Sequence, residues 1–506
     1  AVTQVSTPSN DTTPSFVFTT DEAGTITTNI TEGFTTSASA ATGSNQTITF
    51  DTLGEGTYTG KTVTVTDAAG NAGSITMADF VIDTTVPTAA ITYSSSGPYK
   101  QDDTVTITAT FTEAMVTTPK IAISGVSSIT ATNMSGSGTT WTYAYTAPAG
   151  DGTETIALSA GTDASGNTVT SAPTSGATFT VDNTAPTLTA VTQVSTPNND
   201  NTPSYVFTTN EAGTITTNIT EGFSTSASAS TGSNQTVTFN TLGDGTYANK
   251  TITVTDAAGN SSSLTLTTFV IDTASPTAAI TYSSAAPYKN GETVTITATF
   301  NGAVLDSPVP TIAIAGSGIA NVTSTNMTKV STTVYTYSYA VPTGDGTGTV
   351  TVGTGTDAAG NVVTSTPTSG ATFTVDNTAP TLTAVTQVST PSNDTTPSFV
   401  FTTDEAGTIT TNISQGFSTS VSATTGSNQT ITFNTLGAGT YTGKTVTVTD
   451  AAGNAGSITM ADFVIDTTAP TFTTSPADVT VECSASTAPS ATGTAVSGDS
   501  TATVSY

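Results

Sequence analysis

The chain has 506 residues, which is too many for one hydrophobic core, and 36 acidic side chains against seven lysines give it a formal net charge of −29 without any arginine or histidine. This balance excludes a nucleic-acid surface and disfavours an anionic membrane surface, since both need clustered basic side chains. Apolar runs such as the FVI before Asp83 are far too short to cross a bilayer, so this segment predicts no membrane insertion. Divalent cations are the natural partners of so acidic a chain.

An internal repeat organises the sequence, because the phrase AVTQVSTP begins at Ala1 and returns at Ala190 and Ala384. Each period contains two different units, called type A and type B here. The start of a third kind of unit and the lack of a signal peptide predict an excerpt from a larger protein. The predicted domains are type A over residues 1–83, 190–272 and 384–466, type B over 87–182 and 276–376, and a truncated domain over 470–506.

The first type A unit predicts short strands in the order VTQVS, SFVFTT, TITTNI, a weak strand near Thr35, QTITF, TYTGKTVTVTD and SITMADFVID. Threonines alternate with Val, Ile, Phe and Tyr in these segments, and such alternation is typical of half-buried strands. The segment LGEGTY that ends at Tyr58 predicts a tyrosine corner at the start of strand F of a β-sandwich.

The first type B unit predicts strands in TAAITYSS, TVTITATFTEAM, KIAISG, WTYAYTAP, ETIALSAGTD and GATFTVD. Trp141, Tyr143 and Tyr145 alternate, so they share one face of their strand, which favours a role in the core or as a cover of the sheet. The expected fold class is therefore all-β, as a linear array of immunoglobulin-like β-sandwich domains of two alternating types.

The linkers between units are short: DTTVPT, DNTAPT, DTASPT, DNTAPT and DTTAPT. Each begins with an Asp that leaves the last strand and contains a Pro that opens the next domain. Because proline fixes φ, these joints should be stiffer than a Gly/Ser tether.

Acidic side chains recur at each predicted junction. In a sandwich of this kind the B to C and F to G loops lie at the end where the chain enters, so the linker Asp should approach two acidic loops of the following domain. Oxygen ligands without His or Cys select Ca²⁺ over zinc or copper. The residues expected to bind metal are, junction by junction, Asp83, Glu113, Asp163 and Asn167; Asp182, Asn183, Glu211, Asp256 and Asn260; Asp272, Asp357 and Asn361; and Asp376, Asn377, Asp404, Glu405, Asp450 and Asn454.

The third junction departs from this pattern, because we align Asn301 with Glu113 and therefore expect weaker binding or none. The first domain offers Asp21, Glu22, Asp67 and Asn71 without a linker Asp before them.

A second interpretation of the acidic loops stays open. The sequence DAAGN is also good hairpin chemistry, with Asp closing the turn and Gly or Asn taking a positive φ. Turn chemistry accounts for the loop, but it does not account for the recurring Glu in the B to C loop or for the Asp in each linker.

These motifs resemble known extracellular repeats. TDAAGN with the linker DTTAPT is similar to the bacterial Ig-like repeats of large surface adhesins and biofilm proteins, and ATFTEAM with DASGN is similar to Ig-like repeats of S-layer and other surface proteins. The tail SPADVTVECSAS resembles the start of a hyalin-repeat (HYR) module, and this resemblance implies that Cys483 pairs with a cysteine beyond Tyr506. An extracellular location at the cell surface is the resulting expectation.

No enzyme is expected, because the chain lacks histidine, a second cysteine, a phosphate-binding loop and an arginine clamp. The expected function is a calcium-stiffened stalk or filament shaft of a cell-surface adhesin, with neighbouring copies of the chain as partners if it forms a fibre. Two alternatives stay open: an array of modules that bind a glycan or a protein, and a subunit of an S-layer lattice.

Overall fold

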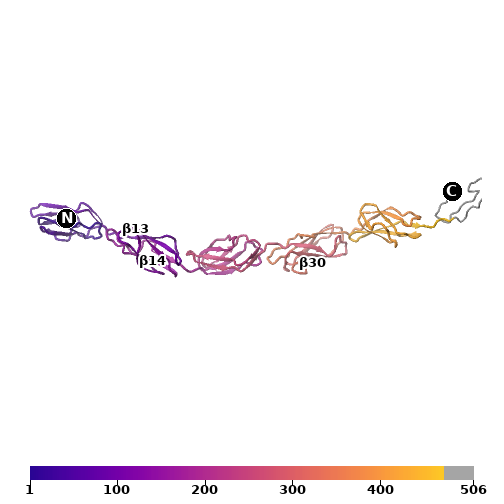
Figure 1. Ribbon diagram of the computed structural model, residues 1–506, viewed down its shortest axis with the longest axis horizontal. Coiled ribbons are helices and arrows are strands. Elements are labelled where there is room, and N and C mark those ends of the chain that lie inside the picture. Colours follow the sequence, from indigo (N-terminus) through magenta and orange to yellow (C-terminus); the bar gives the residue numbers. More distant parts are fainter. Residues whose placement is uncertain (472–506) are drawn as a thin grey trace, which may run out of the picture. The chain divides into compact units, whose positions relative to one another are not determined.

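A computed structural model describes residues 1–471, which form β-strands joined by turns and loops. Figure 1 shows that the strands gather into successive β-sandwiches along the chain. The predicted HYR-like unit and Cys483 lie outside the described residues, apart from its first two positions. None of the elements in residues 1–471 is a helix that could span a membrane.

The chain divides into two compact units. Among the described residues, one comprises 1–195, 202–242 and 246–269, and the other comprises 196–201, 243–245 and 270–471. The first unit holds the first and second sandwiches and most of the third, and the other unit holds the fourth and fifth.

The first sandwich is made of short antiparallel pairs. One sheet has the order β3 (Ser39–Ala40), β2 (Gly24–Thr28), β6 (Thr62–Thr66) and β7 (Ala72–Thr76). Facing it are the pairs β1 (Ser15–Thr19) with β4 (Asn45–Thr49) and β5 (Gly56–Tyr58) with β8 (Phe80–Ile82). Alternate residues point inward as predicted, and the buried side chains include Phe16, Phe18, Ile26, Ile48, Phe50, Val63, Phe80 and Ile82.

Two segments that were predicted as single strands are each divided in the structure. TYTGKTVTVTD forms β5 and β6, because Gly60 between them takes a φ of +59°, in the left-handed region and outside the extended range of a regular strand. SITMADFVID likewise forms β7 and β8, which belong to different sheets.

Tyr58 makes the hydrogen bond of the predicted tyrosine corner, but it lies on a different strand from the one predicted. The Tyr58 hydroxyl donates to the carbonyl oxygen of Gly54 at 2.9 Å, and its ring stacks on Phe80 with centroids 5.0 Å apart. Tyr58 belongs to β5, which pairs with β8, and not to the start of the longer β6. Tyr441 makes the same bond to Gly437 in the fifth sandwich.

The third and fifth sandwiches repeat this arrangement and add a first strand. The strands of the third are β16 (Leu188–Thr192), β17 (Ser204–Thr209), β18 (Gly213–Thr217), β19 (Ser228–Ala229), β20 (Asn234–Thr238), β21 (Gly245–Tyr247), β22 (Thr251–Thr255), β23 (Ser261–Thr265) and β24 (Phe269–Ile271). Those of the fifth are β33 (Leu382–Thr386), β34 (Ser398–Thr403), β35 (Gly407–Thr411), β36 (Ser422–Ala423), β37 (Gln429–Thr432), β38 (Gly439–Tyr441), β39 (Thr445–Thr449), β40 (Ala455–Thr459) and β41 (Phe463–Ile465). The added strands β16 and β33 begin before the positions Ala190 and Ala384 at which these units were predicted to start.

The second sandwich has longer strands. One sheet has the order β13 (Ser135–Thr146), β10 (Thr104–Met115) and β9 (Ala89–Tyr93), and the other has β12 (Ser128–Asn133), β11 (Lys120–Ser124), β14 (Gly152–Ser159) and β15 (Thr178–Val181). Strand β12 was not predicted from the sequence. Trp141 and Tyr145 are buried and Tyr143 packs against the same core, as their alternation predicts.

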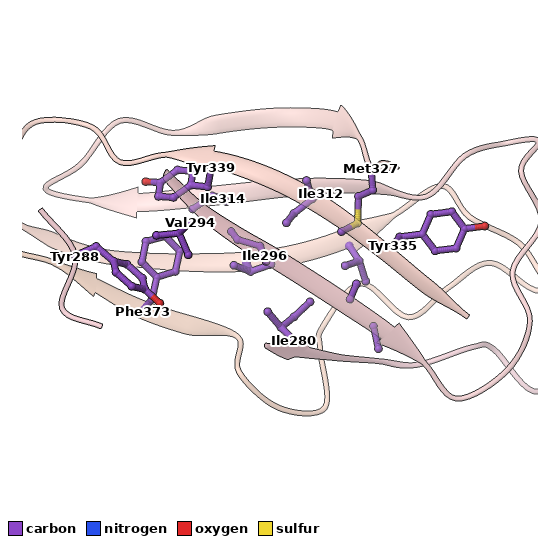
Figure 2. Close-up of a cluster of buried hydrophobic side chains, with 14 of the residues drawn as sticks. Ile280, Tyr288, Val294, Ile296, Ile312, Ile314, Met327, Tyr335, Tyr339 and Phe373 are labelled. Atoms are coloured by element: carbon purple, nitrogen blue, oxygen red, sulfur yellow. The ribbon is translucent and has the colours of Figure 1, made fainter. Parts of the chain in front are cut away.

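The fourth sandwich is the other type B unit. Its sheets have the orders β25 (Ala278–Tyr282), β26 (Thr293–Phe300), β30 (Val334–Ala340), β29 (Thr328–Lys329) and β28 (Val322–Asn326), β27 (Thr311–Ser317), β31 (Gly346–Gly353), β32 (Thr372–Val375). Figure 2 shows side chains of both sheets meeting in its core, among them Ile296, Ile312 and Phe373.

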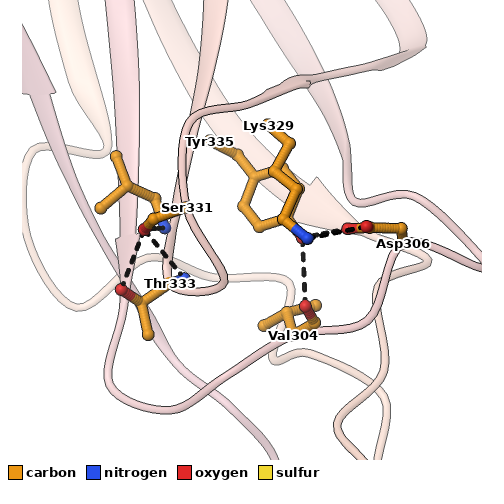
Figure 3. Close-up of polar contacts among 7 residues, drawn as sticks. Val304, Asp306, Lys329, Ser331, Thr333 and Tyr335 are labelled. Atoms are coloured by element: carbon orange, nitrogen blue, oxygen red, sulfur yellow. Dashed lines mark hydrogen bonds and ion pairs between the residues drawn. The ribbon is translucent and has the colours of Figure 1, made fainter.

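Polar contacts hold the segment that follows β26. The Tyr335 hydroxyl donates to the carbonyl oxygen of Val304 at 3.1 Å and to Asp306 Oδ1 at 2.9 Å, and Lys329 Nζ lies 2.7 Å from Asp306 Oδ2 (Figure 3). Strand β26 ends at Phe300, before this segment, whereas β10 continues to Met115. This difference matters at the third junction.

Candidate metal sites at the domain junctions

A turn that begins with Asp and ends with Asn is the local structure on which each junction depends. In the second sandwich, Asp163 Oδ1 accepts the backbone N–H groups of Ser165 at 2.8 Å and Asn167 at 2.9 Å, and Gly166 between them has a φ of +95°. The Asn167 side-chain amide donates to Asp163 Oδ2 at 3.0 Å. The predicted turn chemistry is therefore present.

The same asparagine also reaches across the junction. Asn167 Nδ2 donates to the backbone carbonyl of Asp83, in the preceding linker, at 2.8 Å. Its counterparts in the following sandwiches donate to the linker carbonyls of Asp182 at 2.9 Å, Asp272 at 2.7 Å and Asp376 at 2.9 Å. The turn thus fixes the linker as well as its own loop.

Three carboxylates from two successive sandwiches converge at three of these junctions. In each group one oxygen per residue lies within 4.8 Å of the others. The first Asp follows the last strand of one sandwich, and the Glu and the second Asp belong to the next sandwich. The groups are Asp83, Glu113 and Asp163; Asp182, Glu211 and Asp256; and Asp376, Glu405 and Asp450. We call them the junction triads.

The central glutamate of each triad has a raised pKa. Burial raises the pKa of the Glu113 carboxyl above its ordinary value, and the carboxylates of Asp83 and Asp163 raise it further. The pKa values of Glu211 and Glu405 are raised for the same reasons by burial and by their own aspartates. Each triad therefore holds negative charge that has no cationic side chain within it to balance it.

The third junction lacks this arrangement, and our alignment there was wrong by one residue. TVTITATF of β10 and of β26 end at Phe111 and Phe300, so Asn301 stands where Thr112 stands and Gly302 stands where Glu113 stands. Asn301 Oδ1 accepts the N–H of Thr277 at 2.8 Å, as Thr112 Oγ1 accepts that of Thr88. Asn361 Nδ2 donates to the backbone carbonyl of Asp272 and to Asp357 Oδ2, and no third carboxylate joins these two aspartates.

Nine of the 18 residues expected to bind metal lie outside the triads, and three of these nine make contacts that have not been described above. Asp404 Oδ1 accepts the N–H of Thr381 at 2.6 Å, and this hydrogen bond lowers the pKa of the Asp404 carboxyl. Asn183 Nδ2 donates to the carbonyl of Gly150 at 2.6 Å, and Asn377 makes the equivalent bond in the fourth sandwich. These three side chains shape the linkers.

The sequence analysis missed a further contact at the junctions. Lys100 Nζ donates to the carbonyl of Gly259, in the turn of the next sandwich, at 3.1 Å, and Lys289 Nζ donates to that of Gly453 at 2.7 Å. The corresponding residue of the first sandwich, Asn10, donates its backbone N–H to Ser165 at 3.0 Å. The sequence feature that could have revealed this lysine contact is PYK, which recurs in both type B units.

The donor set of the junction triads fits a hard divalent cation. Ca²⁺ binds six to eight oxygens at about 2.4 Å, so two oxygens on one ion can be up to about 4.8 Å apart. The triad oxygens meet this limit, and neither His nor Cys is present. Glu405 Oε2 is buried and has no hydrogen-bond partner among the described residues, and a cation would satisfy this oxygen.

The family model described as bacterial Ig-like domain matches residues 3–84, 185–273 and 378–467, which together make up half of the chain. These are the type A units. No curated protein sequence matches the chain.

The solved structures that match this chain are distant from it. Domains A168–A170 of titin match at 10% identity over 57% of this chain and 99% of that one, with a TM-score of 0.24. Escherichia coli alpha-2-macroglobulin matches at 8% identity over 91% of this chain and 52% of that one, with a TM-score of 0.17. SGBP-B of the Bacteroides ovatus mixed-linkage glucan utilization locus matches at 18% identity over 56% of this chain and 71% of that one, with a TM-score of 0.15. At these scores the matches carry no argument about function.

Proposed function

Because the chain belongs to the family of bacterial Ig-like domains, we propose that it is a structural shaft of a cell-surface adhesin or filament, in which calcium ions bridge successive sandwiches. Domains of this kind are typical of extracellular or surface proteins and are typically non-enzymatic. The observation that carries the proposal is the convergence of three carboxylates from two sandwiches at each of three junctions.

The physical role of the ion follows from where its ligands lie. A cation held by one linker aspartate and two carboxylates of the next sandwich would oppose rotation about the linker, since bending would separate the ligands. It would also offset the mutual repulsion of the triad, which raises the pKa of its glutamate. Both effects favour a chain of domains that transmits force without folding back on itself.

The aromatic residues of the type B units support a structural role over recognition of a ligand. Trp141 is only 8% exposed and belongs to the core of the second sandwich, and Tyr335 and Tyr339 are buried in the fourth. A glycan-binding surface would need such rings at an exposed loop. The aromatic side chains here stabilise the sandwiches instead.

Calcium titration of the chain tests the proposal. Isothermal titration calorimetry should detect one site for each junction triad, and Glu113→Gln, Glu211→Gln and Glu405→Gln should each remove one site and leave the others. Glu221→Gln, in an exposed turn of the third sandwich, is the matched control and should change nothing. Absence of calcium binding, or equal binding by all of these variants, would refute calcium bridging.

A further inference from the structure

Two of the seven lysines in the chain occupy the same place at a junction. Lys100 and Lys289 follow the buried tyrosine of the PYK motif in the two type B sandwiches. Each side chain reaches the following type A sandwich, where its Nζ donates to the carbonyl oxygen of Gly259 at 3.1 Å or of Gly453 at 2.7 Å. These two basic side chains therefore bind a neutral carbonyl group, although the chain offers 36 acidic side chains.

The backbone on both sides of Lys100 is fixed to the start of the linker. The carbonyl oxygen of Tyr99 accepts the N–H of Asp182 at 2.9 Å, and the N–H of Gln101 donates to Asn183 Oδ1. Lys100 stands between these two contacts. Its side chain therefore extends from a backbone that is already bound to the linker.

The fourth sandwich repeats this arrangement around Lys289. The carbonyl oxygen of Tyr288 accepts the N–H of Asp376 at 2.8 Å, and the N–H of Asn290 donates to Asn377 Oδ1. The same lysine position is thus anchored in the same way in both type B sandwiches, and in both it contacts the type A sandwich that follows.

The turn that Lys100 reaches also carries an aspartate of the second junction triad. Asp256 Oδ1 accepts the N–H of Asn260 at 2.9 Å, and Gly259 between them has a φ of +89°. Asn260 Nδ2 donates to the backbone carbonyl of Asp182 at 2.9 Å. The turn is therefore held at two points, one on the linker and one on Lys100, and two separate points oppose a rotation that either one alone would permit.

Without a cation, the charges of the triad oppose this arrangement. Burial raises the pKa of Glu211, and the carboxylates of Asp182 and Asp256 raise it further, so negative charge on the linker repels negative charge on the next sandwich. A hydrogen bond from a charged donor is stronger than one between neutral groups. The bond from Lys100 to the turn thus holds together two segments that the triad would separate.

We propose that Lys100 and Lys289 are positioning residues that hold the second and fourth junctions in their calcium-binding arrangement before the ion binds. The lysine contacts need no ion, so they would keep these two junctions ordered in the absence of calcium. Ligands that are already in place lose less conformational entropy on binding, so the triads at these junctions would bind calcium more tightly. This last step rests on the proposed function.

Distances between spin labels in the whole chain test the lysine contact in EGTA. The labels are attached to cysteines that replace exposed Thr130 of the second sandwich and exposed Thr216 of the third, in a chain with Cys483→Ser. Lys100→Met keeps the length of the side chain but loses the donor, so it should about double the width of the distance distribution measured by pulsed electron paramagnetic resonance. Lys100→Arg should restore the width, and Lys120→Met, at a half-buried lysine of β11, is the control.

Calorimetry tests the effect on the triad. Lys100→Met should weaken one calcium site about tenfold, as loss of a group that orients metal ligands does, and Lys100→Arg should restore it. In a chain with Glu211→Gln, which lacks that site, Lys100→Met should leave the affinities of the other sites unchanged.

The two measurements separate this proposal from calcium bridging. Equal widths for the wild type and Lys100→Met in EGTA would overturn the proposal, and so would an unchanged affinity of the second junction. A chain that binds no calcium would refute calcium bridging and with it the positioning role. The distances in EGTA would then still show whether the lysine holds the junction, because that measurement contains no calcium.

Discussion

At the glutamate of each junction triad, repulsion by the two neighbouring aspartates competes with attraction to a bound cation. Glu211 lies between Asp182 of one sandwich and Asp256 of its own, so its carboxylate is repelled from both sides unless a cation lies between them. The same side chain is therefore expected to destabilise the junction without calcium and to stabilise it with calcium.

This competition gives Glu211→Gln an effect that changes sign. In EGTA the variant should melt at a higher temperature than the wild type, because the neutral amide removes the repulsion. In calcium it should melt at a lower temperature, because the ion loses a charged ligand; at 100-fold excess over Kd a bound ion contributes about 2.7 kcal/mol. Calorimetric melting in the two buffers checks this, with Glu221→Gln as control. The same sign in both buffers would contradict the account.

The raised pKa of Glu405 predicts a pH effect with a defined direction. A carboxyl whose pKa is higher in the folded state than its ordinary value of about 4.5 binds protons more tightly when folded. In EGTA, its contribution should therefore destabilise the fold as the pH rises from about 4.5 through the raised pKa. The measurement is the difference in melting temperature between the wild type and Glu405→Gln across this range. Calcium should abolish the trend, and a difference that stays constant in EGTA would contradict it.

The sequence was sufficient to identify the triad residues because carboxylates recur at the same place in each repeat. Our alignment misplaced Asn301 by one residue, although TVTITATF, which both type B units share, already makes Gly302 the counterpart of Glu113. The sequence analysis missed Lys100 because the partner of this side chain is a backbone carbonyl, which no residue type reveals.

At the scale of the element, alternation of Thr with apolar residues predicts most strands because inward and outward positions differ so clearly in β1 and β10. Strand β12 was missed because Ile129 is its only large apolar residue. The division between β5 and β6 depends on the backbone conformation of Gly60, which composition does not specify.

Close packing of the sheets gives one strand-level prediction. At Gly24, where β2 begins, a Cβ would stand 2.4 Å from the carbonyl oxygen of Thr66, whereas at Gly54 it would meet nothing within 4 Å. Gly24→Ala should therefore cost about 1–3 kcal/mol, and Gly54→Ala should be nearly neutral. Hydrogen exchange of β2 and β6 measures the local opening free energy. Equal exchange in the two variants would contradict the prediction, because it would mean that the sheet accommodates a Cβ at Gly24 without loss of stability.

The third junction offers a gain-of-function prediction. Gly302 has open space around it and an ordinary φ, and it occupies the position of the triad glutamate. Gly302→Glu should add one calcium site between Asp272 and Asp357, detected as an additional binding equivalent by calorimetry. Ala303→Glu adds the same charge at the neighbouring exposed position and should add no site. Equal behaviour of the two variants would mean that added charge alone, and not the triad geometry, binds the ion.

For the whole molecule, the repeat of AVTQVSTP made the tandem organisation visible from the sequence, and the contacts at the junctions show how one repeat is joined to the next. The backbone carbonyls of four linker aspartates, Asp83, Asp182, Asp272 and Asp376, each accept an asparagine amide from the following sandwich. With a net charge of −29, a chain that binds cations at its junctions would lose part of its self-repulsion there.

Small-angle X-ray scattering of the whole chain, in calcium and then in EGTA at moderate salt, tests calcium bridging most directly. The account predicts that chelation shortens the maximum dimension and increases flexibility. It also predicts that the variant with Glu113→Gln, Glu211→Gln and Glu405→Gln together scatters in calcium as the wild type does in EGTA. The measurement is made at low concentration, so that self-association does not contribute. Identical curves for the wild type in the two buffers would contradict the claim that calcium holds the junctions.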